Sequence, residues 1–381
     1  MMEQATGQAA GAMPRERGAP AFEQLRRLLM PRCPRRLRRP PGFTGFTACL
    51  TICAVLATGA LQAQSGVPAT GAPAAGAPAA GSPAAPATVD LRLQQLTERV
   101  WWVEGLQGEV SHENQGFNSN AGFVVTDDGV VVFDALGTPA LGAALLARIR
   151  SVTDQPVRRV IVSHYHADHF YGLQALTAAG AEVWAHRAVR GYLAGDAPVE
   201  RLAERRQSLA PWVTDEARIV APDVYLDGDT RFRLGGIGFS IYAAGPAHTA
   251  EDLMMLVEEE GVLFAGDLIF AGRVPYVGDA DSRSWLAALE GLAERKPRFV
   301  VTGHGPASRD ASADIALTRD YLVYLREQMG KAADDFVPFD EAYEATDWSR
   351  FAQLPAFAEA NRRNAYNTYL LMEHESLTGR R

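Results

Sequence analysis

The chain has 381 residues, 47% hydrophobic and 22% charged, with a formal net charge of -8. These values exclude a disordered chain, a collagen-like fibre and a multi-span membrane protein. Residues 1–63 contain nine Arg and three Glu, a net charge of +6, so residues 64–381 carry 28 basic and 42 acidic groups, a net charge of -14. Because so acidic a segment repels phosphate backbones, we expect no nucleic-acid partner.

Residues 1–63 are predicted to be a signal peptide. The basic run from Arg32 to Arg39 precedes an apolar stretch from Phe43 to Leu61, and small residues follow. This order is typical of export signals. An uncleaved membrane anchor is the alternative, but Thr and Gly dilute the stretch, which is short for a span. We therefore expect a mature chain that starts near Gln64, lacks an integral membrane span and is periplasmic or secreted.

An Ala/Pro/Gly-rich segment follows at residues 64–88. It has no large apolar residue to bury, so we expect a solvated linker. The three cysteines, Cys33, Cys49 and Cys53, all precede it. The remaining chain therefore has no disulfide and no thiolate ligand, and any metal must be held by His and carboxylate side chains.

The folded body is predicted to start near residue 89, with strands alternating with helices in two similar halves. This pattern predicts two sheets packed face to face with helices outside them. Beyond Asp310 the pattern predicts a helical C-terminal extension, residues 311–381, broken near Pro338 and Pro355. The expected strands are Val100–Val103, Phe123–Thr126, Val130–Phe133, Val157–Val162, Glu182–Ala185, Thr230–Leu234, Phe239–Ala243, Leu253–Val257, Val262–Ala265 and Phe299–Thr302. The expected helices are Pro139–Val152, Phe170–Ala179, a charged region ending near Leu209, and Ser282–Leu292.

A dense cluster of metal-binding residue types follows the Val157–Val162 strand. It reads His164-Tyr165-His166-Ala167-Asp168-His169. Four such residues in this order rarely arise by chance, and a turn after a strand can direct them to neighbouring points. Imidazole nitrogens and carboxylate oxygens are the ligands that zinc accepts where thiolate is absent.

Three further candidates stand where later strands are expected to end: His248, Asp267 and His304. Each alone is weak evidence, because a single strand-end His is usually a hydrogen-bonded structural residue. Together with the motif they make seven nitrogen and oxygen ligands. Glycines flank them and give their loops room to converge.

The order of these motifs resembles the metallo-β-lactamase superfamily over Val100–Pro306. Asn120–Phe123 and Asp134 also fit the opening of that family. The resemblance implies a four-layer αββα sandwich, assigned to residues 89–310, with a metal site at one edge between the sheets. It implies that one metal takes His164, His166 and His248, that the other takes Asp168, His169 and His304, and that Asp267 bridges the two.

The activity implied by this resemblance is hydrolysis of a small molecule at an ester, thioester, lactam or related bond. The reaction uses a hydroxide activated by two zinc ions, with iron or manganese as alternative metals, and Asp168 is the catalytic residue that orients it. Asp at position 267 resembles glyoxalase II and general hydrolases, since the first two classes of true β-lactamases carry Cys there. The leader, the motif and segment Asn361–Glu375 resemble a periplasmic branch termed SoxH-like or quinoprotein-relay zinc metallohydrolases.

Two alternative functions stay open. One is a mononuclear iron oxidoreductase similar to persulfide dioxygenases, and the other is an accessory protein that binds a sulfur carrier or a quinoprotein. Metal analysis separates the first from a dinuclear hydrolase.

Other candidate residues receive structural interpretations. We expect His112 to be a solvated loop residue, His186 to be structural, and Trp101, Trp102 and Trp184 to belong to the core. Arg362-Arg363-Asn364 with Tyr366 and Tyr369 can close over the site and bind an anionic substrate, but a solvated helix face is the favoured interpretation.

Overall fold

The computed structural model describes residues 83–379. The predicted signal peptide and most of the predicted linker lie outside this range, so both stay predictions. Within it, no helix combines the length and the hydropathy needed to cross a membrane.

The larger of two β-sheets has seven strands, which follow one another in space in their order along the chain. The first four pair antiparallel and the last four pair in parallel. The strands are β1 (Leu93–Gln95), β2 (Val100–Val103), β3 (Ala121–Thr126), β4 (Gly129–Phe133), β5 (Val157–Ile161), β6 (Glu182–His186) and β7 (Val224–Leu226). The parallel strands are joined through α2 (Pro139–Val152), α3 (Ala167–Phe170), α4 (Leu173–Ala178), α5 (Val189–Leu193) and α6 (Ala197–Ser208).

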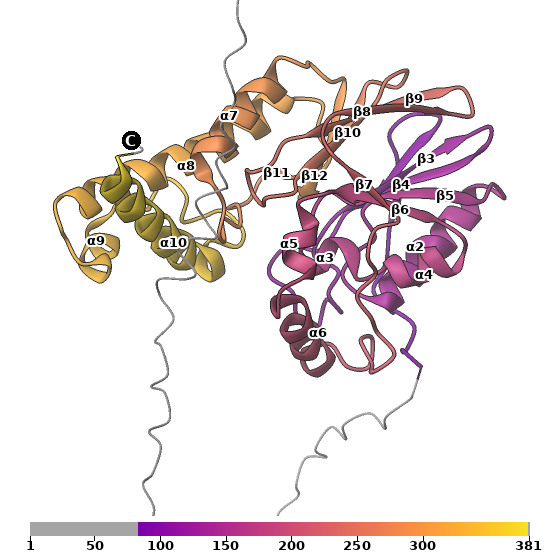
Figure 1. The fold of residues 1–381 in the computed structure, drawn as a ribbon, viewed down its shortest axis with the longest axis horizontal. Helices are drawn as coiled ribbons and strands as arrows, with labels where there is room; N and C mark the ends of the chain where they lie inside the picture. Colours follow the sequence, from indigo (N-terminus) through magenta and orange to yellow (C-terminus); the bar gives the residue numbers. More distant parts are fainter. Residues whose placement is uncertain (1–82, 380–381) are drawn as a thin grey trace, which may run out of the picture. The chain divides into compact units, whose positions relative to one another are not determined.

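The second sheet has five strands, and its last two along the chain pair in parallel across a connecting helix. Its strands are β8 (Thr230–Leu234), β9 (Ile237–Ala243), β10 (Leu253–Val257), β11 (Val262–Phe270) and β12 (Phe299–His304), and the helix is α7 (Ser282–Ala293). The chain ends with α8 (Ala311–Asp334), α9 (Phe339–Ala345) and α10 (Phe357–Thr378), and Figure 1 shows α8 and α10 side by side.

Local chemistry explains where the helices begin. Thr138 caps α2 by accepting a hydrogen bond from the Leu141 N–H, and Pro139 occupies the first turn, where it needs no hydrogen-bond partner. Asp310 caps α8 in the same way through the Ala313 N–H. Both helices bury an apolar face in the core, and this packing stabilises each helix beyond its capped first turn.

Three hydrophobic clusters define the layers. The middle one joins the inner faces of the two sheets, where Phe133 stacks on Phe264 with ring centroids 5.4 Å apart. A second packs Leu141 and Leu145 of α2 on the outer face of the larger sheet. The third packs Trp285 of α7 and the C-terminal helices on the smaller sheet. This order of helix, sheet, sheet and helix confirms the predicted αββα sandwich and its helical extension.

The structure corrects several predicted boundaries. Strand β11 continues through Asp267 to Phe270, and β12 includes His304, so both residues lie within strands and not after them. Strands β1 and β7 were not predicted, because three residues carry too little alternation to be recognised. Trp102 is buried between the sheets, as expected, whereas Trp101 and Trp184 are only partly buried against the core.

Candidate metal centre

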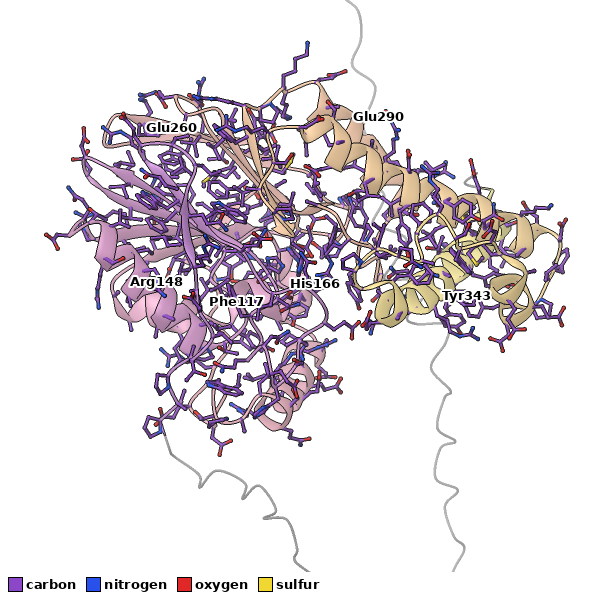
Figure 2. All side chains as sticks on the ribbon, turned by 180° about the vertical axis from the view of Figure 1, so that it is seen from behind. Phe117, Arg148, His166, Glu260, Glu290 and Tyr343 are labelled. Atoms are coloured by element: carbon purple, nitrogen blue, oxygen red, sulfur yellow. The ribbon has the colours of Figure 1, made fainter. Side chains whose placement is uncertain are left out.

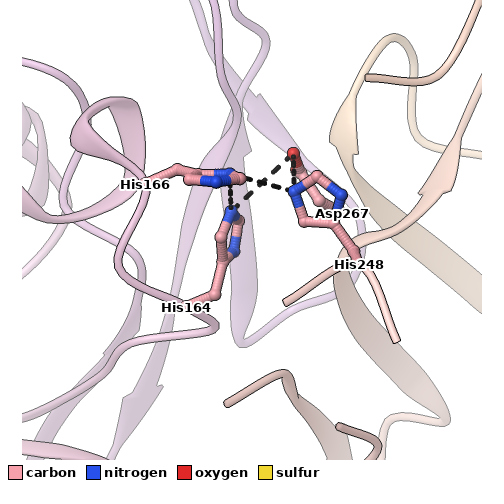
Figure 3. A group of neighbouring side chains, drawn as sticks. All are labelled: His164, His166, His248 and Asp267. Carbon is pink, nitrogen blue, oxygen red and sulfur yellow. Dashed lines mark hydrogen bonds and ion pairs between the residues drawn. The ribbon is translucent and has the colours of Figure 1, made fainter. Parts of the chain in front are cut away.

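Four predicted ligands form one group: His164, His166, His248 and Asp267. In Figure 2, His166 of this group lies away from Glu260 of the β10–β11 turn. Nδ1 of His166 lies 3.0 Å from Nε2 of His164 and 3.0 Å from Nε2 of His248. Oδ2 of Asp267 lies 3.4 Å from Nε2 of His248 and 3.8 Å from Nε2 of His164. Figure 3 shows the three rings and the carboxylate facing a common point.

The remaining ligands, Asp168, His169 and His304, form a second group. Oδ2 of Asp168 lies 3.4 Å from Nε2 of His304 and 3.7 Å from Nε2 of His169. Asp267 also reaches this group, with one oxygen 3.2 Å from Nε2 of His169 and the other 3.3 Å from Nε2 of His304. All seven predicted ligands therefore come together, and Asp267 lies between the two groups.

The chain divides the motif between the two groups through a local change of structure. His164 and His166 lie in the extended segment after β5, and α3 begins directly after His166. Asp168 and His169 stand in the first turn of that short helix and so face a different direction. The correction to the predicted helix start, from Phe170 to Ala167, thus explains how six residues supply two adjacent groups.

Two glycines let Asp267 enter this centre. Gly266 adopts a left-handed backbone with φ of 53°, and the β11–β12 register shifts on both sides of it. This bulge directs the following carboxylate out of the regular pleat. On β12, a Cβ atom at Gly303 would lie 1.9 Å from Oδ1 of Asp267. Any larger residue at position 303 would therefore displace the carboxylate.

A buried carboxylate that is not itself a candidate ligand orients two of the histidines. Asp134 accepts hydrogen bonds from the Ser163 backbone N–H at 2.7 Å and the Ser163 hydroxyl at 2.8 Å, and lies 2.9 Å from Nδ1 of His169. Oγ of Ser163 is also 2.9 Å from Nδ1 of His164. With Nδ1 engaged, each ring directs Nε2 into the centre, which is the arrangement found around metal-binding histidines.

The loop before β3 supports the second group. Nδ1 of His304 donates to the Asn118 carbonyl oxygen at 2.6 Å, and Nδ2 of Asn118 donates to Oδ2 of Asp168 at 3.3 Å. The Ser119 hydroxyl donates to the Asp168 carbonyl oxygen at 2.5 Å. Asn118 was not predicted, since a polar loop residue carries no sequence pattern that marks it.

Burial favours the neutral form of three of the imidazoles. Burial holds the pKa of His164 well below its ordinary value, and it lowers the pKa of His166. Burial also lowers the pKa of His248 to about 3. A neutral imidazole keeps a lone pair for a cation, so burial favours the form of these histidines that can bind a metal.

The carboxylates give the centre a negative charge. Burial alone would raise the pKa of Asp267, but His304 and His169 outweigh it and hold the pKa well below its ordinary value. For His169, burial lowers the pKa, but Asp267, Asp168 and Asp134 prevail and raise it well above the ordinary value. The three carboxylates thus favour a positive charge on His169, as they would favour a cation in its place.

The contacts fit metal ions better than they fit a closed hydrogen-bond network. Nε2 of His169 and Oδ1 of Asp267 are buried without a hydrogen-bond partner, although they face each other at 3.2 Å. Atoms bound tetrahedrally to zinc at about 2.0 Å stand about 3.3 Å apart. The four separations given above for the first group run from 3.0 to 3.8 Å, and those given for the second group and Asp267 run from 3.2 to 3.7 Å. Each group therefore matches the spacing of ligand atoms around one cation.

A loop after β11, residues 271–281, borders the first group. The Tyr276 ring packs edge-on against His166 and His248, with centroids 5.8 and 6.3 Å away. Arg363 of α10 lies over the same ring at 4.9 Å and forms an ion pair with Glu109 at 2.6 Å. The C-terminal extension therefore contacts the loops that border the site. The position of Tyr276 beside the candidate ligands was not predicted from the sequence.

The remaining candidate residues from the sequence are not part of either ligand group. His112 is exposed, as expected, and lies outside both groups, as does His186. Arg362 forms an ion pair with Asp340 of α9, and the Tyr369 hydroxyl donates to the Val337 carbonyl oxygen. The contacts of these two residues are thus with the helical extension. Arg363 lies over Tyr276, and Asn364 bonds to the same loop after β11.

Comparison with known proteins agrees with the fold. The model of the metallo-beta-lactamase superfamily matches residues 114–304, which is half of the chain. The chain belongs to the metallo-β-lactamase superfamily. The predicted SoxH-like branch stays a prediction.

Two solved structures share the fold at low sequence identity, and a third resembles part of the chain. The stereoselective inverting sec-alkylsulfatase Pisa1 from Pseudomonas sp. is 19% identical, with a TM-score of 0.55 over 73% of this chain and 50% of that one. A double mutant of that sulfatase gives 18% identity with the same TM-score and coverage. A metallo-beta-lactamase from Pontibacter korlensis is 24% identical, with a TM-score of 0.48 over 61% of this chain and 99% of that one.

Proposed function

We propose that the protein is an exported, dinuclear zinc-dependent hydrolase that acts on an ester, thioester, lactam or related bond of a small molecule. Members of the superfamily are largely hydrolases and usually bind divalent metals. The observation that carries the proposal is the convergence of seven nitrogen and oxygen ligands into two adjacent groups, with Asp267 in reach of both.

The two acidic ligands are suited to different tasks. The Asp267 side chain retains 3% exposure and the Asp168 side chain retains 21%. Asp267 is thus shielded between the groups, where a carboxylate offsets the repulsion between two cations. Asp168 is open to incoming water and substrate, so it can orient the attacking water and accept its proton.

Two divalent cations at this centre would supply water acidified to near neutrality and polarisation of the scissile bond. The chain itself fixes the geometry. Asn118 holds Oδ2 of Asp168 at 3.3 Å and Ser119 anchors its backbone, so that this carboxylate keeps one orientation. Hydrolysis then requires no Ser or Cys nucleophile, which agrees with the lack of cysteine after Cys53.

Completeness of the second group favours this proposal over a mononuclear iron oxidoreductase. Asp168, His169 and His304 are all buried or half-buried and lie close enough to hold an ion of their own. A single iron would leave these groups and their charges without a function.

Metal content and activity test the proposal together. Purified protein should contain two zinc ions per chain by elemental analysis and should hydrolyse at least one member of a panel of lactams, thioesters, lactones and phosphoesters. His164→Ala with His166→Ala should lose the metal of the first group. His112→Ala, an exposed loop control, should keep both metals. Iron at one equivalent, or a double variant with full metal content, contradicts the proposal.

A further inference from the structure

Asn118, in the loop before β3, contacts two ligands of the second group that come from different sheets. Asp168 lies in α3, which follows β5 of the larger sheet, and His304 ends β12 of the smaller sheet. Nδ2 of Asn118 donates to Oδ2 of Asp168 at 3.3 Å, and the Asn118 carbonyl oxygen accepts from Nδ1 of His304 at 2.6 Å. One residue therefore links a ligand from each side of the sandwich.

The backbone contact fixes the orientation of the His304 ring. A carbonyl oxygen can only accept, so Nδ1 of His304 carries a proton, and the neutral ring then has its lone pair on Nε2. Nε2 is the atom that faces Oδ2 of Asp168 at 3.4 Å and Oδ2 of Asp267 at 3.3 Å. Asn118 thus favours the form of His304 that can bind a cation at this group.

The side chain of Asn118 makes its contact with Asp168 at a cost. It is buried, and its Oδ1 atom has no hydrogen-bond partner among the residues that the structure describes. Turning the amide over would place Oδ1 against the Asp168 carboxylate, where two acceptors repel each other. Because an unpaired buried oxygen costs stability, the position of this amide is better explained by the carboxylate that it orients than by folding alone.

The next two residues hold Asn118 in this position. The Ser119 hydroxyl donates to the Asp168 carbonyl oxygen at 2.5 Å. Asn120 is buried, and it is anchored to the chain around His304. Its Nδ2 and backbone N–H donate three hydrogen bonds, each of 2.8 Å, to the carbonyl oxygens of Thr302, Gly305 and Gly303. The segment is therefore fixed against both ligands at once.

We propose that Asn118 is a positioning residue that determines the affinity of the second ligand group for its cation. The inference rests on the proposed function, since it requires a metal at each group. The side chain orients Asp168 and the backbone orients His304, so Asn118 sets the spacing of these two ligands. Within the part of the chain that the structure describes, its hydrogen bonds reach no ligand of the first group. Losing its amide should therefore weaken one metal and not both.

Competition with a chromogenic chelator measures the two zinc affinities of the wild type. His164→Ala with His166→Ala removes ligands of the first group only, so the affinity that this double variant retains is assigned to the second group. The same titration is made on Asn118→Ala and Asn118→Leu. Both remove the amide donor and leave the backbone carbonyl in place, and Leu also keeps a branched side chain there.

Asn114 supplies a matched control, because it is a buried asparagine of the same loop. Its Oδ1 accepts from the Ser111 and Gly116 N–H groups at 2.9 Å each, and its Nδ2 donates to the Glu109 carbonyl oxygen at 2.8 Å. None of these partners is a candidate ligand. Asn114→Ala therefore removes more hydrogen bonds than Asn118→Ala without touching the metal centre. Urea denaturation of the metal-free variants measures the stability of each.

We expect Asn118→Ala and Asn118→Leu to bind the second zinc about 10- to 100-fold more weakly, the usual effect of losing a group that orients a metal ligand. The affinity of the first group should stay at its wild-type value. Asn114→Ala should keep both affinities, although it should lower the urea midpoint at least as far as Asn118→Ala does. A role in folding alone would instead make metal affinity follow stability.

Wild-type affinity for the second zinc in Asn118→Ala, equal weakening of both affinities in it, or the same loss in Asn114→Ala would overturn the inference and leave the proposed function intact. If Asn118→Ala does not fold, Asn118→Leu decides by the same criteria. Loss of both metals from the double histidine variant also overturns the inference, because the second group would then hold no ion of its own. A wild type that binds fewer than two zinc ions refutes the proposed function and this inference together.

Discussion

Oδ2 of Asp134 lies 2.9 Å from Nδ1 of His169, and both side chains are almost completely buried. Burial raises the pKa of Asp134, while His169 and the Ser163 N–H and hydroxyl groups oppose that shift. Asp134 itself adopts a left-handed backbone with φ of 60°, so the chain accepts local strain to present this carboxylate. The pair fixes the imidazole with Nε2 directed into the proposed metal centre.

Replacing Asp134 with Asn should therefore weaken metal binding without removing a ligand. We expect a 10- to 100-fold lower affinity in Asp134→Asn, the usual effect of losing a carboxylate that orients a ligand histidine. Competition with a chromogenic chelator measures it. Asp127→Asn, at an exposed carboxylate paired with Arg99, is the control and should bind metal as the wild type does. Equal affinity in both variants would show that Asp134 does not orient the ligand.

Asn364 of α10 connects the C-terminal extension to the loop that carries Arg273 and Tyr276. Its Oδ1 accepts from the Val277 N–H at 2.9 Å, and its Nδ2 donates to the Pro275 carbonyl oxygen at 2.7 Å. Asn364→Ala should lower the free energy of unfolding by about 2–3 kcal/mol, because both backbone groups lose buried partners. Urea denaturation measures this change.

A matched control for Asn364 stands one turn further along the same helix. Asn367 donates one hydrogen bond, at 2.9 Å, to the Gly278 carbonyl oxygen of the same loop. Asn367→Ala should cost only about 1 kcal/mol, since it removes one partly buried contact. Equal losses in the two variants would mean that Asn364 does not hold the loop through its two bonds.

Glu375 ties α10 to the two helices beneath it and should make stability depend on pH. It accepts hydrogen bonds from Arg326 at 2.7 Å and Arg283 at 3.0 Å. Burial would raise its pKa, but the two arginines prevail and lower the pKa below 4.5. A lowered pKa contributes stability that is present above pH 4.5, the value for the unfolded chain, and is lost as the pH falls through the folded-state pKa.

Glu375→Gln should accordingly be about 2 kcal/mol less stable than the wild type at neutral pH. The difference should shrink below pH 4.5, as the wild-type carboxylate takes up its proton. Urea denaturation at neutral pH and at about pH 3.5 measures both values. Glu327→Gln, at an exposed carboxylate of α8, should show little effect at either pH. A difference for Glu375→Gln that does not change with pH contradicts the account.

The predicted signal peptide can be tested by the position of its cleavage. The order of basic, apolar and small residues over positions 32–63 predicts cleavage near Gln64. N-terminal sequencing of protein recovered from an exported fraction should begin within a few residues of Gln64. Recovery of the intact leader in a membrane fraction is the result that would refute cleavage.

Much of the fold could be predicted from the sequence because its signals are local. Helix α2 was predicted with its observed ends, Pro139 and Val152, since a Thr cap, a proline and an apolar period coincide there. The ends of β11 and β12 could not be predicted. Their extension through Asp267 and His304 depends on parallel pairing across a bulge, which is a property of two strands brought together and not of either segment.

The ligands were predictable for a similar reason, and the residues around them were not. Four of the ligands lie within six positions, and such a density of metal-binding residue types is easily recognised in a sequence: His164, His166, Asp168 and His169. Asn118 and Tyr276 stand in ordinary loops, and their place beside the candidate ligands comes from contacts that only the assembled structure shows.

The central claim is a shared two-metal centre bridged by Asp267, and metal stoichiometry in variants of that residue tests it most directly. Elemental analysis should give two metals per chain for the wild type, one or fewer for Asp267→Ala, and two for Asp267→Cys, since thiolate is also a zinc ligand. Turnover should fall with the metal in Asp267→Ala. Two metals and wild-type turnover in Asp267→Ala would contradict the bridging role and, with it, the proposed centre.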